Sequence, residues 1–177
     1  MNEKKSYKYM KNFLLAAFII YILILLDFTL VAGGFGRDIF KIFSFDRQSY
    51  MDYIRENTNF IPFATVKLFI SGYMKNALGL WDTILNLIGN FLGFMPLTFF
   101  LHLYFKNTRS FGKMLLTVII TVIIVEILQL IFLTGSCDID DLILNTSGAM
   151  LFYVFLKSKR ISEKLNKLTF GLWEVKE

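Results

Sequence analysis

Four stretches of this chain are dominated by hydrophobic residues, and short charged segments separate them. The stretches lie at about 12–32, 82–105, 114–133 and 141–156. The hydrocarbon core of a bilayer is about 30 Å thick, so a helix needs about 20 mostly apolar residues to cross it. The pattern predicts an all-α, polytopic membrane protein, a four-helix transmembrane bundle in which residues 1–177 form one domain.

The first stretch follows a basic N-terminus and fits either a membrane span or a cleaved signal peptide. Four lysines among residues 1–11 precede the apolar run, and small residues stand at 32–34. The run is long enough to cross a bilayer, which favours an uncleaved span. Asp27, near its far end, is expected either to reach the interface or to join other polar residues.

The connection between the first two stretches changes character along its length. Residues 37–59 are mixed in charge and look soluble, whereas residues 61–81 are apolar and aromatic but carry Lys67 and Lys75. The apolar part is too short for a comfortable span. It predicts an outer interfacial or re-entrant helix between spans 1 and 2.

Polar residues and a proline interrupt the second stretch. Asn86 and Asn90 are four residues apart and share a helix face. Pro96 removes a backbone hydrogen bond and is expected to kink the helix. His102, near the end of the stretch, is expected to lie at the membrane interface rather than in a ligand set. Beyond the fourth stretch, the tail 157–177 predicts an amphipathic surface helix.

The distribution of basic residues predicts the orientation in the membrane. Lysine and arginine gather near the N-terminus, at 106–113 and in the tail, whereas the turn at 134–140 has acids but no lysine or arginine. Cytoplasmic loops carry the excess of basic residues, so we expect a multi-pass protein of the cytoplasmic (inner) cell membrane with both termini in the cytoplasm. Membrane lipid is then the expected partner, and no aromatic-interleaved basic patch indicates nucleic-acid binding.

This orientation places the embedded acids and amides in the outer half of the bundle. They come from the second, third and fourth stretches and the turn before the fourth: Asn86, Asn90, Glu126, Gln129, Asp138, Asp141 and Asn145. Together they predict a polar pocket that opens to the outside. The alternative is that these groups only hydrogen-bond between helices and hold the bundle together.

Glu126 is the candidate for catalytic chemistry, because a carboxyl group in hydrocarbon is costly without a partner. It could act as a general acid or base. Asp138, Asp140 and Asp141 could supply oxygen ligands to a divalent cation. Alternatively, the turn could simply cap the fourth helix, with Asp138 or Asp140 accepting backbone N–H bonds. Cys137, the single cysteine, excludes an internal disulfide and is expected to be a small packing residue.

In their order and spacing, the motifs of this chain resemble the VanZ-like family of small bacterial membrane proteins. The resemblance covers about residues 55–156 and rests on NFIPF at 59–63, NLIGN at 86–90 with Phe94 and Pro96, EILQ at 126–129, and DIDD at 138–141 followed by Asn145 and Gly148. The family is named for a protein linked to resistance to the glycopeptide teicoplanin. The resemblance therefore implies an envelope protein, with a lipoglycopeptide or a lipid-linked cell-wall component as partner.

The resemblance supplies no catalytic residue, and this chain departs from the family at one point. Many members have an arginine in the turn before the aspartates, where this chain has TGSC at 134–137. If that arginine pairs with an anionic ligand in other members, this chain must use Arg37, Arg47 or Arg55 instead, or bind a different ligand.

Three functions are open at this point. The protein could lower susceptibility to teicoplanin-type lipoglycopeptides without catalysis. It could be a membrane-embedded hydrolase or transferase acting on a lipid-linked envelope substrate, with Glu126 as acid or base. It could also be a non-catalytic partner subunit.

Overall fold

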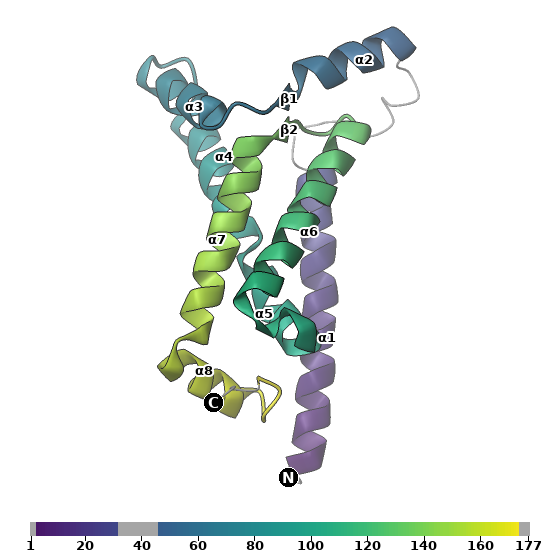
Figure 1. The fold of residues 1–177 in the computed structure, drawn as a ribbon, viewed down its shortest axis with the longest axis vertical. Coiled ribbons are helices and arrows are strands. Elements are labelled where there is room, and N and C mark those ends of the chain that lie inside the picture. The colour runs from purple at the N-terminus through teal and green to yellow at the C-terminus, as the bar shows by residue number, and fades with distance from the viewer. Residues whose placement is uncertain (1–2, 32–45, 174–177) are drawn as a thin grey trace.

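The computed structural model describes residues 3–31 and 46–173, and these residues are mostly helical (Figure 1). Four stretches among them are long and apolar enough to cross a membrane: Lys5–Leu30, Thr83–Tyr104, Phe111–Ile131 and Ile139–Lys157. Each overlaps a predicted span, so the predicted four-helix bundle of a multi-pass membrane protein is confirmed.

The elements follow one another along the chain as α1 (Glu3–Leu26), the π-helix η1 (Asp27–Val31), α2 (Arg47–Glu56), β1 (Thr58–Asn59), α3 (Ala64–Met74), α4 (Leu80–Gly93), α5 (Met95–Tyr104), the 3-10 helix η3 (Lys106–Arg109), α6 (Phe111–Ile131), β2 (Cys137–Asp138), α7 (Ile139–Lys157) and α8 (Lys159–Leu168). The first helix starts well before the apolar run, because the lysine-rich segment that precedes it consists largely of residues that a helix accepts readily.

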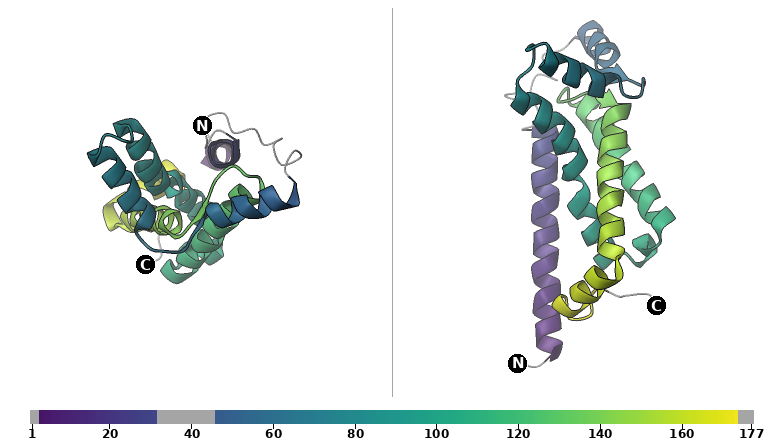
Figure 2. Two further views of the ribbon diagram at one scale, coloured as in Figure 1. Left: turned by 90° about the horizontal axis from the view of Figure 1, so that it is seen from above. Right: turned by 90° about the vertical axis from the view of Figure 1, so that its left-hand side faces the viewer.

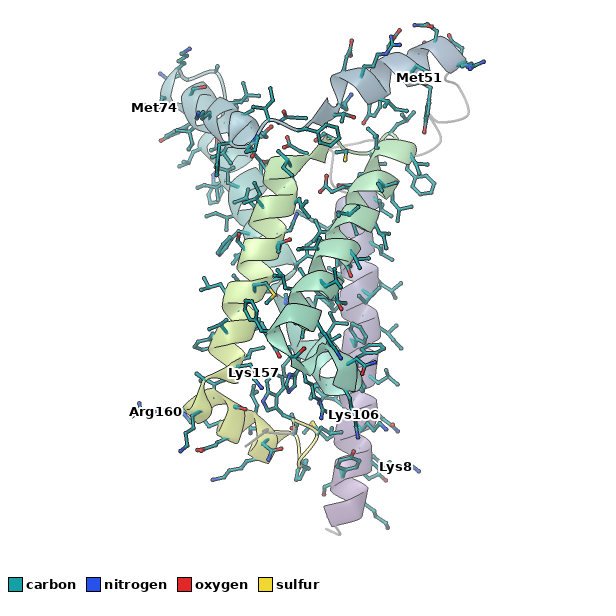
Figure 3. The ribbon with its side chains drawn as sticks, in the orientation of Figure 1. Lys8, Met51, Met74, Lys106, Lys157 and Arg160 are labelled. Carbon is teal, nitrogen blue, oxygen red and sulfur yellow. The ribbon has the colours of Figure 1, made fainter. Side chains whose placement is uncertain are left out.

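The two ends of the bundle differ in what they carry. The segments α2, β1, α3 and β2 lie at one end, called here the α3 end (Figure 1). Helix α8 and the start of α1 lie at the other, called the α8 end, and α8 runs across the direction of the spans (Figures 1 and 2). Figure 3 places Lys8, Lys106, Lys157 and Arg160 at the α8 end, and Met51 and Met74 at the α3 end.

Apolar side chains from all four spans form the main core. Its buried members are Leu25, Phe94, Leu97, Leu101, Met114, Val118, Val122, Val125, Ala149, Met150 and Tyr153. Helix α1 joins the core along one face, where the Phe18 ring stacks on Phe100 with 5.0 Å between centroids. Other faces of the spans leave large apolar side chains exposed, among them Ile20, Leu116 and Leu151, as a protein surrounded by lipid requires.

The second span is broken at Phe94, where α4 ends and α5 begins. Pro96 lies in the first turn of α5, where its missing N–H leaves no intrahelical bond unmade. The Gly93 carbonyl accepts a hydrogen bond of 2.9 Å from the Tyr21 hydroxyl of α1. The kink predicted from Pro96 is confirmed, and α1 satisfies a carbonyl at the break.

The tail helix is confirmed as α8, but the chain then turns back into the bundle. Trp173 is fully buried, stacks on His102 with 3.9 Å between ring centroids, and donates its Nε1 hydrogen to Ser162 Oγ at 2.8 Å. His102, expected at the membrane interface, is instead completely buried inside the protein, with Trp173 stacked on it and the Tyr153 ring centroid 6.0 Å away.

Candidate functional site

A tight turn brings the acidic segment directly over the end of α6. Leu133 adopts a left-handed backbone (φ 58°), and the Thr134 N–H donates to the Gln129 carbonyl at 2.9 Å, so α6 ends in a Schellman-type cap. The chain then pairs in parallel with the α2–α3 connection, with Thr58 opposite Cys137. This pairing holds the connection against the start of α7.

Asp138 begins α7 and also binds the α2–α3 connection. Its side chain accepts the Asp140 N–H at 2.8 Å, which makes it the N-cap of α7 and confirms the capping alternative. The same carboxylate accepts hydrogen bonds from the Thr65 hydroxyl and, at 3.3 Å, from the Asn59 amide. Asp138 is thus shared between the first turn of α7 and the segment that leads into α3.

Asp140 caps a helix that lies far from it in sequence. Its side chain is 1% exposed and accepts the backbone N–H groups of Phe63, Thr65 at 2.9 Å and Val66 at 3.0 Å. Phe63 is the N-cap position of α3, has a left-handed backbone (φ 64°) and makes no side-chain cap of its own. A carboxylate at a helix N-terminus satisfies free donors and complements the helix dipole. Asp140 therefore anchors α3 to the bundle.

A second layer of polar groups lies between the spans below these aspartates. Glu126 is buried and accepts the Asp138 N–H at 3.2 Å. The Asn90 amide donates to the Asp141 carboxylate, and the Asn145 amide donates to the Asp141 carbonyl at 2.8 Å. These contacts connect α4, α6 and α7, as the structural alternative for the embedded acids and amides supposed.

The polar cluster at the α3 end thus contains six of the predicted residues: Asn90, Glu126, Asp138, Asp140, Asp141 and Asn145. Gln129 instead donates to the Thr29 carbonyl of η1 at 2.9 Å. The Asn86 Oδ1 atom is buried and has no hydrogen-bond partner within the described part of the chain. Asp27 is exposed.

Asn59 and Thr65 also belong to the site, although the sequence analysis did not predict either as a site residue. A motif pointed to Asn59, since NFIPF is one of the segments that carried the family resemblance. Nothing local indicated Thr65, because its partner Asp138 lies 73 residues away in sequence.

The cluster is acidic, and the described arginines lie away from it. Arg47 and Arg55 are exposed on α2, and Arg55 pairs with Asp52 at 3.7 Å. Arg37 lies outside the described residues. Burial raises the pKa of the Cys137 thiol, and the neighbouring Glu126 and Asp138 charges act in the same direction. Cys137 is therefore predominantly a thiol at neutral pH.

The donors around the aspartates bear on the cation prediction. Within residues 3–31 and 46–173, no three His, Cys, Asp or Glu side chains are grouped so that they could hold a metal ion. Asp138 and Asp140 direct their oxygens at N–H and O–H donors of the α2–α3 segment. Cation binding by these aspartates stays a prediction, whereas their hydrogen bonds show that Asp138 caps α7 and Asp140 caps α3.

The geometry of the cluster does not by itself identify the protein, but a comparison with protein families does. The family model VanZ/LLP1 matches residues 18–160. The chain belongs to the VanZ/LLP1 family. The match runs from the middle of α1 into α8, so it includes the second half of the first span, the other three spans and the whole polar cluster of this VanZ/LLP1 protein. Comparisons with curated proteins and with solved structures found no match.

Proposed function

We propose that this VanZ/LLP1 protein acts at the outer face of the bacterial cytoplasmic membrane and lowers susceptibility to teicoplanin-type lipoglycopeptides. It would bind the drug, or alter access to the lipid-linked cell-wall component that the drug targets. Both ligands are amphiphiles, with an acyl or prenyl chain joined to a large polar part. The surface that receives them has to offer apolar and polar groups side by side at the edge of the bilayer.

The observation that carries the proposal is the placement of the 60–63 loop beside the polar cluster. Phe60, Ile61 and Phe63 are 72%, 70% and 55% exposed. Asn59 on one side of the loop donates to Asp138, and Phe63 at its other end donates its N–H to Asp140. The loop is therefore held on the buried acids while its apolar side chains stay outside. Exposed apolar groups of this kind are available to a hydrocarbon chain.

The polar contacts would come from the cluster and from Asn86, which lies one helical turn before Asn90 on α4. The Asn86 Oδ1 atom is an acceptor that no described residue uses, so a donor on the ligand could bond to it. The cluster is acidic, which favours a cationic or hydrogen-bond-donating group over an anionic one. This chain has no arginine in the 134–137 turn, so the arginine of other members is not part of the proposed contact.

The proposal requires the α3 end to face outward. In a Cys137→Ser background, Arg55→Cys on α2 is expected to react with a membrane-impermeant maleimide in intact cells, because the Arg55 side chain is 71% exposed. Lys164→Cys on α8 is expected to react only after permeabilisation, since the basic end should be cytoplasmic. Removing Cys137 avoids background labelling, because its mostly protonated thiol would still react slowly with the maleimide. The reverse labelling pattern would contradict the orientation.

The activity itself is tested by expression in a susceptible Gram-positive host. We expect the inhibitory concentration of teicoplanin to rise more than that of vancomycin, because the apolar loop should discriminate in favour of the acylated drug. Glu126→Gln is expected to abolish the rise at unchanged membrane abundance, because it alters the charge and bonding at the centre of the cluster.

Ile123→Ala is the matched control for Glu126→Gln, since Ile123 lies on the same helix but is 39% exposed toward lipid. It should leave the rise intact. No change in susceptibility to either drug on expression of the wild-type protein would rule out the proposed function for this chain.

A further inference from the structure

The α8 end carries a second surface, separate from the polar cluster. Helix α8 exposes Lys159, Arg160, Lys164 and Lys167, and Glu163 is the one acid in the helix. Its apolar side chains Ile161 and Leu165 pack instead on the bundle, against the buried cluster of Leu103, Leu156 and Trp173. The exposed side of the helix is therefore strongly basic.

The chain fixes α8 in this position from both ends. The helix begins at Lys159, directly after the fourth span ends at Lys157. Beyond its C-terminus, the Trp173 N–H donates to Thr169 Oγ1 at 3.0 Å and its indole donates to Ser162 Oγ at 2.8 Å, both in buried surroundings. Because α8 starts where the fourth span ends and runs across the spans (Figure 2), a bilayer that covers the spans would place α8 at the depth of the lipid headgroups.

We propose that the exposed face of α8 binds the headgroups of anionic phospholipids in the leaflet that surrounds the α8 end. The ligand chemistry is a phosphodiester with net negative charge, joined to acyl chains. The basic side chains supply the charge complement, and Lys8 and Lys106 add to it at the same end (Figure 3). This inference does not depend on the proposed function or on which leaflet is cytoplasmic.

Two exposed apolar residues favour a lipid over a soluble acidic partner. Leu168 and Phe170, at the end of α8, are 67% and 48% exposed. They adjoin Lys167, so charge and apolar surface occur together, as in helices that lie in a membrane interface. A nucleic acid or an acidic soluble protein would pair with the lysines but leave both apolar side chains in water.

The test measures lipid binding to the purified full-length chain in detergent by native mass spectrometry. Phosphatidylglycerol and phosphatidylcholine are offered in equal amounts, and the wild-type protein is expected to retain phosphatidylglycerol preferentially. Each basic residue at an anionic surface contributes about fivefold to binding, so Lys164→Gln with Lys167→Gln should weaken phosphatidylglycerol binding by roughly tenfold or more. Glu163→Gln should strengthen it.

The matched control is Lys67→Gln with Lys75→Gln, two exposed lysines at the α3 end, which should leave the preference unchanged. All these positions are exposed, so the wild-type protein and the variants should have equal melting temperatures in phosphatidylcholine. A change in lipid preference at equal melting temperature then reports lipid binding rather than folding. Equal retention of both lipids by the wild-type protein would overturn the proposal. So would an unchanged preference in the α8 variant, or an equal loss in the α8 and control variants.

Discussion

Gly148→Ala is expected to destabilise the bundle more than any other single-methyl change in the spans. A Cβ atom at Gly148 would lie 1.7 Å from the Phe91 carbonyl oxygen and 2.7 Å from the carbonyl carbon. These are backbone atoms of α4, so no side-chain rotation relieves the clash. The α4 and α7 backbones must separate instead. Small residues permit this kind of close approach between membrane helices.

Moving α4 and α7 apart would also disturb the polar cluster. Asn90 precedes Phe91 on α4 and donates to Asp141 on α7, so moving the two helices apart stretches the bond that joins them. Overpacking alone costs about 1–3 kcal/mol, and the backbone contact together with the stretched bond places Gly148→Ala at or above the upper end of that range.

The measurement is the melting temperature of the purified protein in detergent, together with its abundance in the membrane. Gly112→Ala is the control, because a Cβ at Gly112, in the first turn of α6, meets no atom within 4 Å. Alanine is the better helix former by about 1 kcal/mol, so Gly112→Ala should be neutral or slightly stabilising. A Gly148→Ala protein as stable as the wild type would show that α4 and α7 do not approach as closely as described.

The sequence was sufficient for those parts of the fold that depend on local pattern. Apolar run length predicted the four spans, and Pro96 predicted the break, because a missing N–H acts on the helix that contains it. Asp138 as an N-cap was also predictable, since the capping side chain and its N–H partner are two residues apart. Each of these effects depends only on residues that lie within a short distance of one another in the sequence.

Other features depend on contacts between distant segments, and sequence pattern carries no signal for them. Trp173 buries His102 only because the tail after α8 folds back, which the amphipathic pattern of the tail does not encode. Gly148 entered the sequence analysis only as part of the motif that carries the family resemblance, although the close approach of α4 makes it critical for packing. The structure brings Glu126 together with Asn90 and Asn145. It leaves Gln129 and Asn86 outside the cluster, and the bond from Gln129 to Thr29 was not foreseeable.

Asp140→Asn is expected to release the N-terminus of α3 while the four spans stay folded. The carboxylate accepts three backbone N–H groups of residues 63–66. An asparagine offers only one oxygen. With its oxygen at the Oδ2 position, the asparagine could keep the bonds from Thr65 and Val66, but the Phe63 N–H would lose its acceptor and face the NH₂ group. A buried donor without an acceptor costs about 1–3 kcal/mol. Amide hydrogen exchange at residues 63–68 should therefore accelerate by about tenfold, since 1.4 kcal/mol corresponds to that factor.

Asp46→Asn provides the control for a capping aspartate in general. Asp46 is the N-cap of α2, where it accepts the Ser49 N–H at 2.8 Å, and this hydrogen bond holds the pKa of its exposed carboxyl below the usual range. Its replacement should increase exchange only at the start of α2, because both partners belong to the same helix. Exchange at residues 63–68 that is equal in Asp140→Asn and the wild type would contradict the anchoring role of Asp140.

The same measurement separates anchoring from cation binding at the aspartates. If Asp140 acts as the cap of α3, exchange at residues 63–68 in the wild-type protein should not change when divalent cations are removed with a chelator, because the carboxylate is already bound to N–H groups. If the aspartates hold a cation that orders this segment, chelation should accelerate exchange there as Asp140→Asn does. Because the 60–63 loop is fixed by these same bonds, Asp140→Asn should also remove the proposed rise in the inhibitory concentration of teicoplanin, even though residue 140 is buried and cannot contact a ligand directly.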